Sequence, residues 1–478
     1  MFKGQQMNSK ARLLVKNVSY VFSSNIISFI ISTVLILIVP KLIGIEEYGY
    51  WQLYMFYASY MGFFHFGWND GIYLRYGGEK YDQLDKNIFF SQFWMLSIFQ
   101  LLLAIIIISV SIFMDTDIDK RFIFISVAFC MVLANMRAMP LFIFQATSRI
   151  KEYSNITMLD RILYGSFIVS LLLLGFREYE LMIVADLIAK FISLLYSLYY
   201  CKDIIFRKIS VFRINFTEAK ENINVGIKLM FSNIASMLII GIVRFGIERN
   251  WNVATFGKVS LTLSISNFIM IFINAIGIII FPVLRRVDER KLSKIYTILR
   301  EILVLILLGT LILYFPIKMI LSIWLPQYID SLKYMALVFP MCVYEGKMAL
   351  LVNTYLKTLR EEKLMLKINL YSLALSVVLT FIAVRVFNNL NFAILCIVVL
   401  LAFRCAIAEA FLSKILKISI GKALLMESII SLIFIMIGWY GSSLNSILIY
   451  LFSYMVYIMI KRKDIILAIR ELKLLLKK

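Results

Sequence analysis

The sequence predicts an all-helical, multi-pass membrane protein with about 14 transmembrane helices, arranged as two parallel six-helix bundles plus a C-terminal helix pair. Composition, the number of long apolar runs and an internal repeat predict this class. Of the 478 residues, 62% are hydrophobic and only 17% are charged, and the mean hydropathy is +0.87. Water-soluble globular proteins carry about 25% charged residues, so a soluble fold is excluded.

Long apolar runs follow one another along the whole chain. A helix needs about 20 such residues to cross a bilayer, because in lipid its backbone must satisfy its own hydrogen bonds. The polar, basic N-terminus lacks a small-residue cleavage pattern, so the first run is expected to stay as a helix. The candidate spans are residues 18–40, 50–76, 87–113, 122–146, 155–176, 180–201, 224–247, 256–284, 300–325, 331–356, 366–387, 390–413, 422–441 and 443–460.

Basic residues concentrate in the loops on one side of these spans. With the N-terminus placed in the cytoplasm, the opposite side carries only Lys41, Lys120, Arg121, Arg177, Arg249 and Lys333. Because cytoplasmic loops are enriched in Lys and Arg, both termini are predicted to be cytoplasmic. The formal net charge of +21 is therefore interpreted as topology signal facing anionic lipid, and no nucleic-acid partner is expected.

Weak sequence matches recur at a fixed offset of 208 residues. Ser24-Asn25-Ile26 corresponds to Ser232-Asn233-Ile234, and Tyr48-Gly49 corresponds to Phe256-Gly257. Six spans separate the copies, so two parallel bundles related by an axis along the membrane normal are predicted, with a cavity at their seam. The expected domains are 1–212, 213–418 and, for the two extra helices and the basic tail, 419–478.

Motifs for catalysis, nucleotide binding or metal binding are absent from the sequence. The five cysteines have no C-x-x-C spacing and are interpreted as packing residues. There is a single histidine and no phosphate-binding G-x-x-x-x-G-K-[ST] loop. We therefore expect neither an enzyme nor a cofactor, and any energy must come from ion gradients, membrane potential or substrate supply.

Several motifs together resemble bacterial polysaccharide-biosynthesis flippases, the lipid-linked oligosaccharide branch of the MATE/MOP superfamily. They are GIEEYGYWQL at residues 44–53, FGWNDGIYLRYGG at 66–78, SNIASMLIIGIVRFGIE at 232–248 and FGKVSLTLSIS at 256–266. The resemblance covers the whole chain. It implies translocation of undecaprenyl-diphosphate-linked oligosaccharides, such as O-antigen or capsule repeat units, across the cytoplasmic membrane by alternating access. It also implies that the last two spans border a groove for the lipid tail.

Eleven basic residues lie inside the predicted spans or at their edges, where exposure to lipid is costly. The Asp186–Lys190 and Arg244–Glu248 spacings predict pairs along one helix. Arg161, Arg300 and Arg385 lie near span ends, where a long side chain reaches the headgroups. The full set is Arg137, Arg161, Lys190, Lys228, Arg244, Lys258, Arg300, Lys318, Lys347, Arg385 and Arg404.

Arg137, Arg244, Lys347 and Arg404 are the candidates for a cationic cavity that accepts a diphosphate. Arginine offers a phosphate paired donors, and lysine offers a point charge. The alternative is that these residues form bridges between the bundles. Two further sets are weaker candidates. By the resemblance, Lys228 and Lys258 lie at the cytoplasmic and outer mouths of the lateral openings, or serve as interfacial anchors. Asn25 and Asn233 bond either sugar or a neighbouring helix.

The stretch at residues 65–78 places polar groups near the cytoplasmic third of the second span. Gly67 and Gly71 bracket a site where the backbone can bend or pack closely. Asp70 with His65 could exchange a proton as access alternates. Alternatively, Asp70 pairs with Arg75 or another basic group as a gate. Glu345 is the second candidate for coupling.

These observations favour a flippase over two rivals. A multidrug or small-cation exporter of the same superfamily predicts an acidic cavity, and the interior surplus of Lys and Arg opposes it. A glycan polymerase or ligase needs a large outer loop, which the sequence lacks. The expected partners are the lipid-linked oligosaccharide, membrane lipids, and a polymerase and glycosyltransferases of the same pathway, with the protein itself a monomer.

Overall fold

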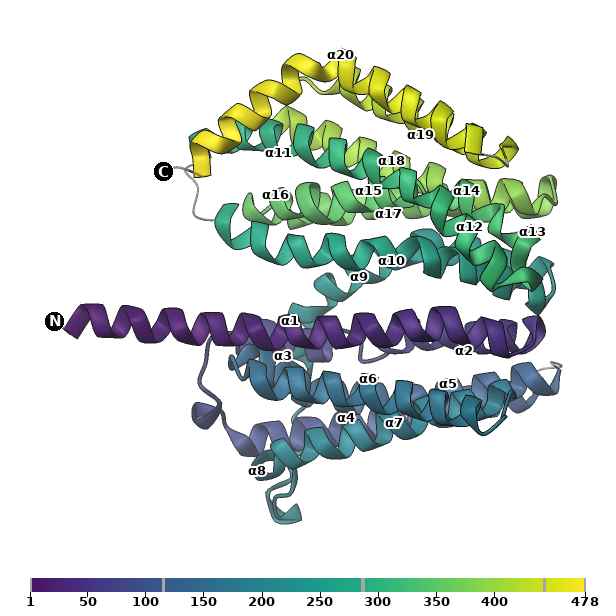
Figure 1. Cartoon of the computed structure of the whole chain (residues 1–478). Coiled ribbons are helices and arrows are strands. Elements are labelled where there is room, and N and C mark those ends of the chain that lie inside the picture. Colours follow the sequence, from purple (N-terminus) through teal and green to yellow (C-terminus); the bar gives the residue numbers. More distant parts are fainter. Residues whose placement is uncertain (1, 114–116, 285–288, 442–443, 477–478) are drawn as a thin grey trace. The chain divides into compact units, whose positions relative to one another are not determined.

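The computed structural model describes residues 2–113, 117–284, 289–441 and 444–476, and every regular element in these ranges is helical (Figure 1). The chain divides into two compact units, Met1–Ile234 and Ala235–Lys478. The helix α9 begins in unit 1 and ends in unit 2. We describe each unit by itself.

Unit 1 consists of long helices joined by short loops. Two 3₁₀ turns, Tyr81–Gln83 and Ile209–Val211, lie in the connections before α4 and before α9. The helices are α1 (Phe2–Leu42), α2 (Ile45–Met61), α3 (Trp68–Arg75), α4 (Lys86–Phe113), α5 (Ile118–Ala146), α6 (Ile150–Leu173), α7 (Tyr179–Tyr200), α8 (Lys202–Ile205) and the first part of α9 (Phe216–Asn250).

Unit 2 contains more interruptions. Two π-helical turns, Met348–Val352 and Ile382–Val386, lie inside otherwise α-helical runs, and 3₁₀ turns lie at Leu311–Leu313 and Pro326–Tyr328. The α-helices that follow α9 are α10 (Val253–Leu284), α11 (Glu289–Thr310), α12 (Tyr314–Trp324), α13 (Ile329–Leu332), α14 (Tyr334–Val338), α15 (Met341–Lys347), α16 (Asn353–Thr358), α17 (Glu362–Phe381), α18 (Leu390–Leu416), α19 (Gly421–Tyr440) and α20 (Leu444–Leu476).

The predicted membrane spans agree well with the helices. Among the described residues, 11 helical segments are long and apolar enough to cross a membrane, and each coincides with a predicted span. The other three predicted spans fall on α2 with α3, on α10 and on α20. The predicted span 50–76 is divided between two helices, because α2 ends at Met61 and α3 begins at Trp68; this agrees with the bend that the sequence indicates near Gly67. Positive φ angles at Phe66 (51°) and Gly67 (84°) break the helix there.

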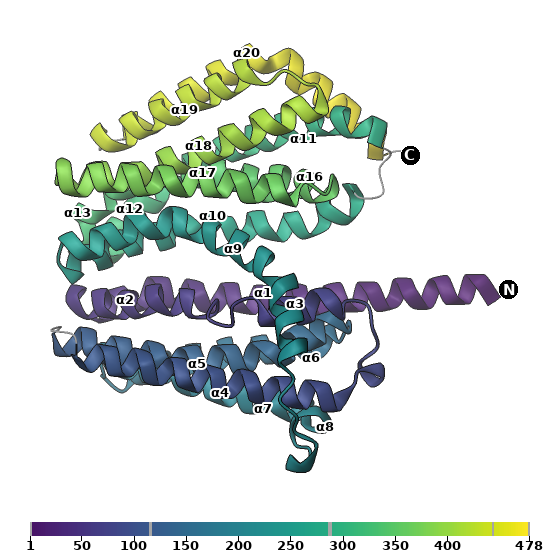
Figure 2. The same ribbon diagram turned by 180° about the vertical axis from the view of Figure 1, so that it is seen from behind.

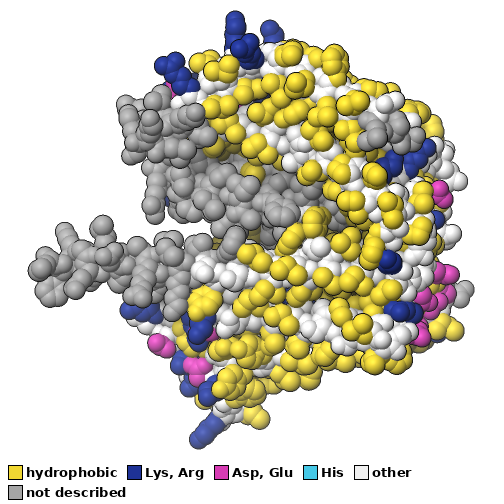
Figure 3. All heavy atoms as spheres, viewed as in Figure 1, with side chains coloured by type: hydrophobic (Ala, Val, Ile, Leu, Met, Phe, Trp, Pro, Cys, Tyr) yellow, Lys and Arg dark blue, Asp and Glu magenta, His cyan; other side chains and the backbone are white. Residues whose placement is uncertain are grey.

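In unit 1 the helix α5 is the centre of packing. Helices α2, α3, α4 and α7 all contact α5, while α1 packs on α6 (Figures 1 and 2). In the most apolar 18-residue stretch of α5, 50% of the residues are buried, whereas the corresponding share for α4 is 28%. Most apolar side chains of α4 therefore point outward. Figure 3 shows hydrophobic side chains over the visible face of this unit. Such helices need no polar face, because lipid and protein core are both apolar.

In unit 2 the run α14–α15–α16 forms the core. This run covers Tyr334–Thr358, and 89% of the residues in its most apolar 18-residue stretch are buried. Helix α10 contacts α14, α15 and α16, helix α18 contacts α14 and α15, and α20 packs on α11 and α19. Polar groups on α15 are therefore buried and must find partners on neighbouring helices.

Candidate functional site

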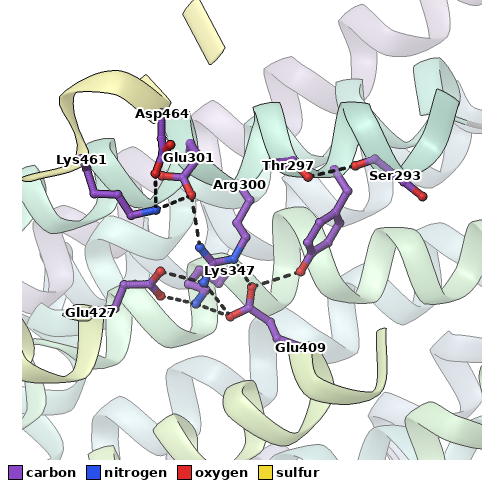
Figure 4. A network of polar contacts seen from close by, with 10 residues as sticks. Ser293, Thr297, Arg300, Glu301, Lys347, Glu409, Glu427, Lys461 and Asp464 are labelled. Carbon is purple, nitrogen blue, oxygen red and sulfur yellow. Dashed lines mark hydrogen bonds and ion pairs between the residues drawn. The ribbon is translucent and has the colours of Figure 1, made fainter. Parts of the chain in front are cut away.

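Four charged side chains meet in the interior of unit 2 (Figure 4). Arg300 on α11 donates to Glu409 on α18, with Nε and Oε1 2.8 Å apart, and its Nη2 lies 2.7 Å from Oε1 of Glu427 on α19. Lys347 on α15 places Nζ 2.5 Å from Oε2 of both glutamates. None of the four side chains is more than 2% exposed. Two positive and two negative charges make the group formally neutral.

The buried group continues toward one end of unit 2. Arg300 lies 3.8 Å from Glu301, and Lys461 on α20 bridges Glu301 at 2.9 Å and Asp464 at 3.1 Å. The hydroxyl of Tyr296 donates to Glu409 at 3.0 Å. We call Tyr296, Arg300, Glu301, Lys347, Glu409, Glu427, Lys461 and Asp464 the charge network. It ties five helices, α11, α15, α18, α19 and α20, to one another.

Two sequence predictions change in this region. Lys347 was a candidate for the cationic cavity and has no opposite charge one turn away on its own helix, but it pairs with carboxylates from α18 and α19. Arg300 was expected to reach the headgroups, and it is instead 2% exposed inside the network. Spacing along one helix reveals only partners on that helix, whereas these pairs join residues at least 62 positions apart.

Arg404 forms a second polar cluster in unit 2. From α18 it donates through Nε to Asn369 of α17 at 3.0 Å, through Nη1 to Glu345 of α15 at 3.1 Å, and through Nη2 to Ser236 of α9 at 2.9 Å. Its side chain is 5% exposed, while that of Glu345 is 23% exposed. The fixed fork of the guanidinium thus holds three neighbouring helices.

Helices α15 and α18 exchange two ion pairs. Glu345 and Lys347 come from α15, and their partners Arg404 and Glu409 come from α18. Bridges between the two bundles were the alternative role predicted for the interior cations. The described partners of Lys347 and Arg404 lie within unit 2.

The two remaining cation candidates have different surroundings. Arg137 in unit 1 has no opposite charge one turn away on its own helix, but its Nη1 lies 2.6 Å from Asp160 of α6 and 3.0 Å from Ser193 of α7. Arg244 in unit 2 donates to Ser260 at 2.9 Å and lies 5.1 Å from the ring centroid of Phe256.

The predicted pair of Asp186 and Lys190 on α7 is confirmed. Asp186 also accepts a hydrogen bond from the hydroxyl of Tyr54 on α2, at 2.6 Å. The carboxylate therefore joins α2 to α7, and two donors already engage it.

His65 and Asp70 lie together beside the break between α2 and α3. The Nε2 of His65 is 3.7 Å from Oδ2 of Asp70, and both residues are buried. The backbone N–H of Gly67 donates to Nδ1 of His65 at 3.0 Å, so a neutral imidazole carries its proton on Nε2, the nitrogen that faces Asp70. The predicted alternative of an Asp70–Arg75 pair is wrong, because Arg75 turns to α9.

Glycines allow α3 to approach α9 closely. A Cβ atom on Gly71 would lie 1.9 Å from the carbonyl oxygen of Asn222, and one on Gly226 would lie 2.0 Å from that of Gly67. The predicted close packing at Gly67 and Gly71 is therefore confirmed. The sequence did not single out Gly226 for close packing, although this glycine lies at the start of an apolar run, as Gly67 and Gly71 lie at the end of one.

A polar clamp closes the end of this helix crossing. The guanidinium of Arg75 reaches Glu218 at 2.5 Å, Glu221 at 2.7 Å and Asn222 at 2.6 Å. The hydroxyl of Tyr76 donates to Glu218 at 2.8 Å. The first part of α9 is therefore anchored to α3 by both shape and charge.

The weaker candidates lie nearer the surface. Asn25, Lys228 and Asn233 are exposed, Lys258 is half-buried, and their roles stay predictions. Arg161 and Arg385 are exposed, as expected for side chains that reach the headgroups. Among the described residues, no group of three His, Cys, Asp or Glu side chains could hold a metal ion.

Two apolar grooves lie on the sides of the units. A groove of about 430 Å³ runs between α1 and α6 and is lined by residues such as Ile31, Val34 and Gly165. A groove of about 310 Å³ lies between α19 and α20 and is lined by residues such as Ile433 and Phe452. Both suit a hydrocarbon chain better than a polar ligand.

The 11 long apolar helices among the described residues define a multi-pass membrane protein, and its fold resembles that of solved MATE/MOP transporters. A solved inward-facing multidrug resistance MATE transporter of the MOP superfamily matches with a TM-score of 0.57 and 12% identity, covering 82% of this chain and 98% of that one. A MOP superfamily transporter from Pyrococcus furiosus, described as having reversed pocket polarity, matches with a TM-score of 0.53 and 14% identity, covering 84% and 96%.

Residues 14–287 match the profile of the polysaccharide biosynthesis protein family, and the chain belongs to this family. No match was found among curated protein sequences. The resemblance identified from the sequence motifs is thus confirmed at the level of family and superfamily fold.

Proposed function

We propose that this protein moves undecaprenyl-diphosphate-linked oligosaccharide repeat units from the inner to the outer leaflet of the bacterial cytoplasmic membrane. One observation carries the proposal, namely that a member of a polysaccharide biosynthesis family has a transporter fold. A glycan unit built on a lipid inside the cell must cross the membrane before it joins a surface polymer such as O-antigen or capsule. The distribution of Lys and Arg along the sequence supports a cytoplasmic position for both termini in this proposal.

The side-chain geometry reduces the number of residues that are candidates for binding the diphosphate. Lys347 is paired with two buried glutamates and is 1% exposed, so it is the weakest of the four cavity candidates. Arg137 uses only Nη1 in the contacts described, and its side chain is 15% exposed. Arg137, Arg244 and Arg404 are therefore the residues proposed to meet phosphate oxygens, because a guanidinium can add donors to an anion while keeping one partner.

The groove between α19 and α20 supports the lipid half of the proposed substrate. Its described lining is almost entirely aliphatic and aromatic. A prenyl chain that stays in this groove would keep its hydrocarbon out of water while the polar head crosses. A membrane potential negative inside favours expulsion of an anion by about 2.3 kcal/mol per charge per 100 mV. Neither a cofactor nor catalysis enters this scheme, in which the protein acts as a monomer beside a polymerase and glycosyltransferases.

Proteoliposomes test this proposal directly. A prenyl-diphosphate oligosaccharide is placed in one leaflet, and its head is detected in the other with a membrane-impermeant lectin. Transfer that depends on the folded protein is the expected result. Export of a cationic dye without any glycan transfer would replace the proposal with the multidrug exporter. Elongation of the glycan without transfer would indicate a polymerase.

A further inference from the structure

The end of unit 1 formed by the loops around α8 contains a polar pocket that the translocation scheme does not use. The pocket has a volume of about 600 Å³, which lies within the range of small-ligand sites. It is formed by the turn before α4, the connection between α5 and α6, and the end of α7. Its lining residues are Lys80, Tyr81, Asp82, Thr147, Arg149, Tyr199, Tyr200, Lys202 and Asp203.

The pocket wall is held by internal contacts. Arg149 lies 4.3 Å from the ring centroid of Tyr81 and is paired with Glu152 at 2.8 Å. The hydroxyl of Tyr81 donates to Asp203 at 2.8 Å, and Lys86 lies 2.6 Å from the same carboxylate. Burial raises the pKa of Asp203, but the hydrogen bonds from Lys86 and Tyr81 outweigh it and hold that pKa below its usual value. Asp203 is therefore an ionised and occupied part of the wall.

The charge that remains for a ligand is small and positive. Once the Lys86–Asp203 and Arg149–Glu152 pairs are set aside, Lys80, Asp82 and Lys202 remain, and their formal sum is +1. Both lysines are exposed, and Lys202 lies 5.5 Å from the ring centroid of Tyr199. A singly charged phosphodiester balances this sum, whereas a diphosphate would leave negative charge uncompensated.

An apolar stripe leads along α7 to the same pocket. Its members recur at helical spacing on one face, are 39–63% exposed and end at Tyr199 in the pocket wall: Val184, Ile188, Phe191, Leu195 and Tyr199. Figure 3 shows Lys and Arg side chains, interspersed with Asp and Glu, at this end of unit 1, near α8 in Figure 1. Aromatic and basic side chains at the end of an apolar helix are typical of the headgroup level of a bilayer.

We infer that this pocket binds the headgroup of an anionic glycerophospholipid of the cytoplasmic leaflet, with one acyl chain lying along the exposed stripe of α7. Lys80 and Lys202 contact the phosphodiester, and Tyr199 covers the junction between headgroup and chain. Basic pockets beside transmembrane helices bind anionic lipid headgroups in this way. The lipid is a resident of the protein and is not the transported substrate.

Native mass spectrometry of the purified full-length protein tests this site. The probes are phosphatidylglycerol and phosphatidylcholine with identical acyl chains. We expect a retained phosphatidylglycerol adduct, and roughly tenfold weaker retention in the double variant Lys80→Gln with Lys202→Gln. The matched control is Lys208→Gln with Lys220→Gln, which removes the same charge from two exposed lysines outside the pocket and should leave retention unchanged.

Further arms identify the source of the phosphate. Dihexanoyl phosphatidylglycerol should bind more weakly than the long-chain lipid, because it cannot cover the α7 stripe. Equal binding of the short-chain lipid, or displacement by inorganic phosphate, would overturn the lipid assignment. Preferential displacement by undecaprenyl diphosphate would make the pocket a substrate site instead. Equal retention of both phospholipids, or equal losses in both double variants, would also refute the site. None of these readouts depends on translocation.

Discussion

Lys347 and Glu409 lie 2.5 Å apart, from Nζ to Oε2, in the most deeply buried part of unit 2. They come from α15 and α18, and Glu427 of α19 holds the same ammonium group at the same distance. A buried cation in this protein is therefore not, by itself, a ligand site. The charge network instead fastens the C-terminal helices α19 and α20 to the helices that surround α15.

Replacing Lys347 by Met should destabilise the protein by about 3–5 kcal/mol, because two buried carboxylates would then share the single positive charge of Arg300 within the described network. Adding Glu427→Gln should recover much of this loss, since Arg300 and Glu409 remain as a neutral pair. Unfolding in detergent, followed by circular dichroism, measures both effects. Arg385→Gln is the control, because this arginine is exposed. A single variant as stable as the wild type would show that Lys347 is neutral or hydrated.

Variants of Arg404 distinguish a structural role of this residue from a role in substrate binding. Arg404→Gln should leave Glu345 without its 3.1 Å partner and reduce both stability and glycan translocation. In the double variant with Glu345→Gln, stability should recover, while translocation should stay about tenfold reduced if the guanidinium meets the phosphate. Unfolding and proteoliposome transfer are measured on the same preparations. Recovery of both quantities would make Arg404 purely structural.

Gly71→Ala should disrupt the crossing of α3 and α9, because the new methyl group would meet the backbone oxygen of Asn222 at 1.9 Å. Backbone cannot rotate away as a side chain can, so a loss of at least about 1–3 kcal/mol is expected. Gly62→Ala is the matched control: it has a right-handed helical backbone and no atom within 4 Å of its Cβ position. Equal stability of the two variants would contradict the close approach.

The sequence predicts the spans well because each helix is selected by its own local composition. It also predicts the Asp186–Lys190 pair, whose members lie one turn apart. It does not predict that Lys347 meets Glu409, since that contact depends on how α15 and α18 pack. The sequence also indicates a possible bend at Gly67. It does not predict that α2 already ends at Met61 or that Phe66 takes a positive φ, because neither follows from the local pattern of apolar residues.

Asp70 is the sharpest test of proton coupling. In the wild-type protein, Oδ2 of Asp70 lies 3.7 Å from Nε2 of His65. Asp70→Asn keeps the size of the side chain and an oxygen atom for this position, but an amide cannot release a proton. If Asp70 couples transport to a proton gradient, the variant should still exchange glycan between leaflets at equal pH and should lose its response to an imposed gradient. The control is Asp186→Asn, which removes the partner of Lys190 and Tyr54. This control should lower stability without selectively removing the gradient response.

A gradient response in Asp70→Asn equal to that of the wild type would eliminate Asp70 as the coupling group. Glu345, which pairs with Arg404 and has a side chain that is 23% exposed, would then be the remaining candidate.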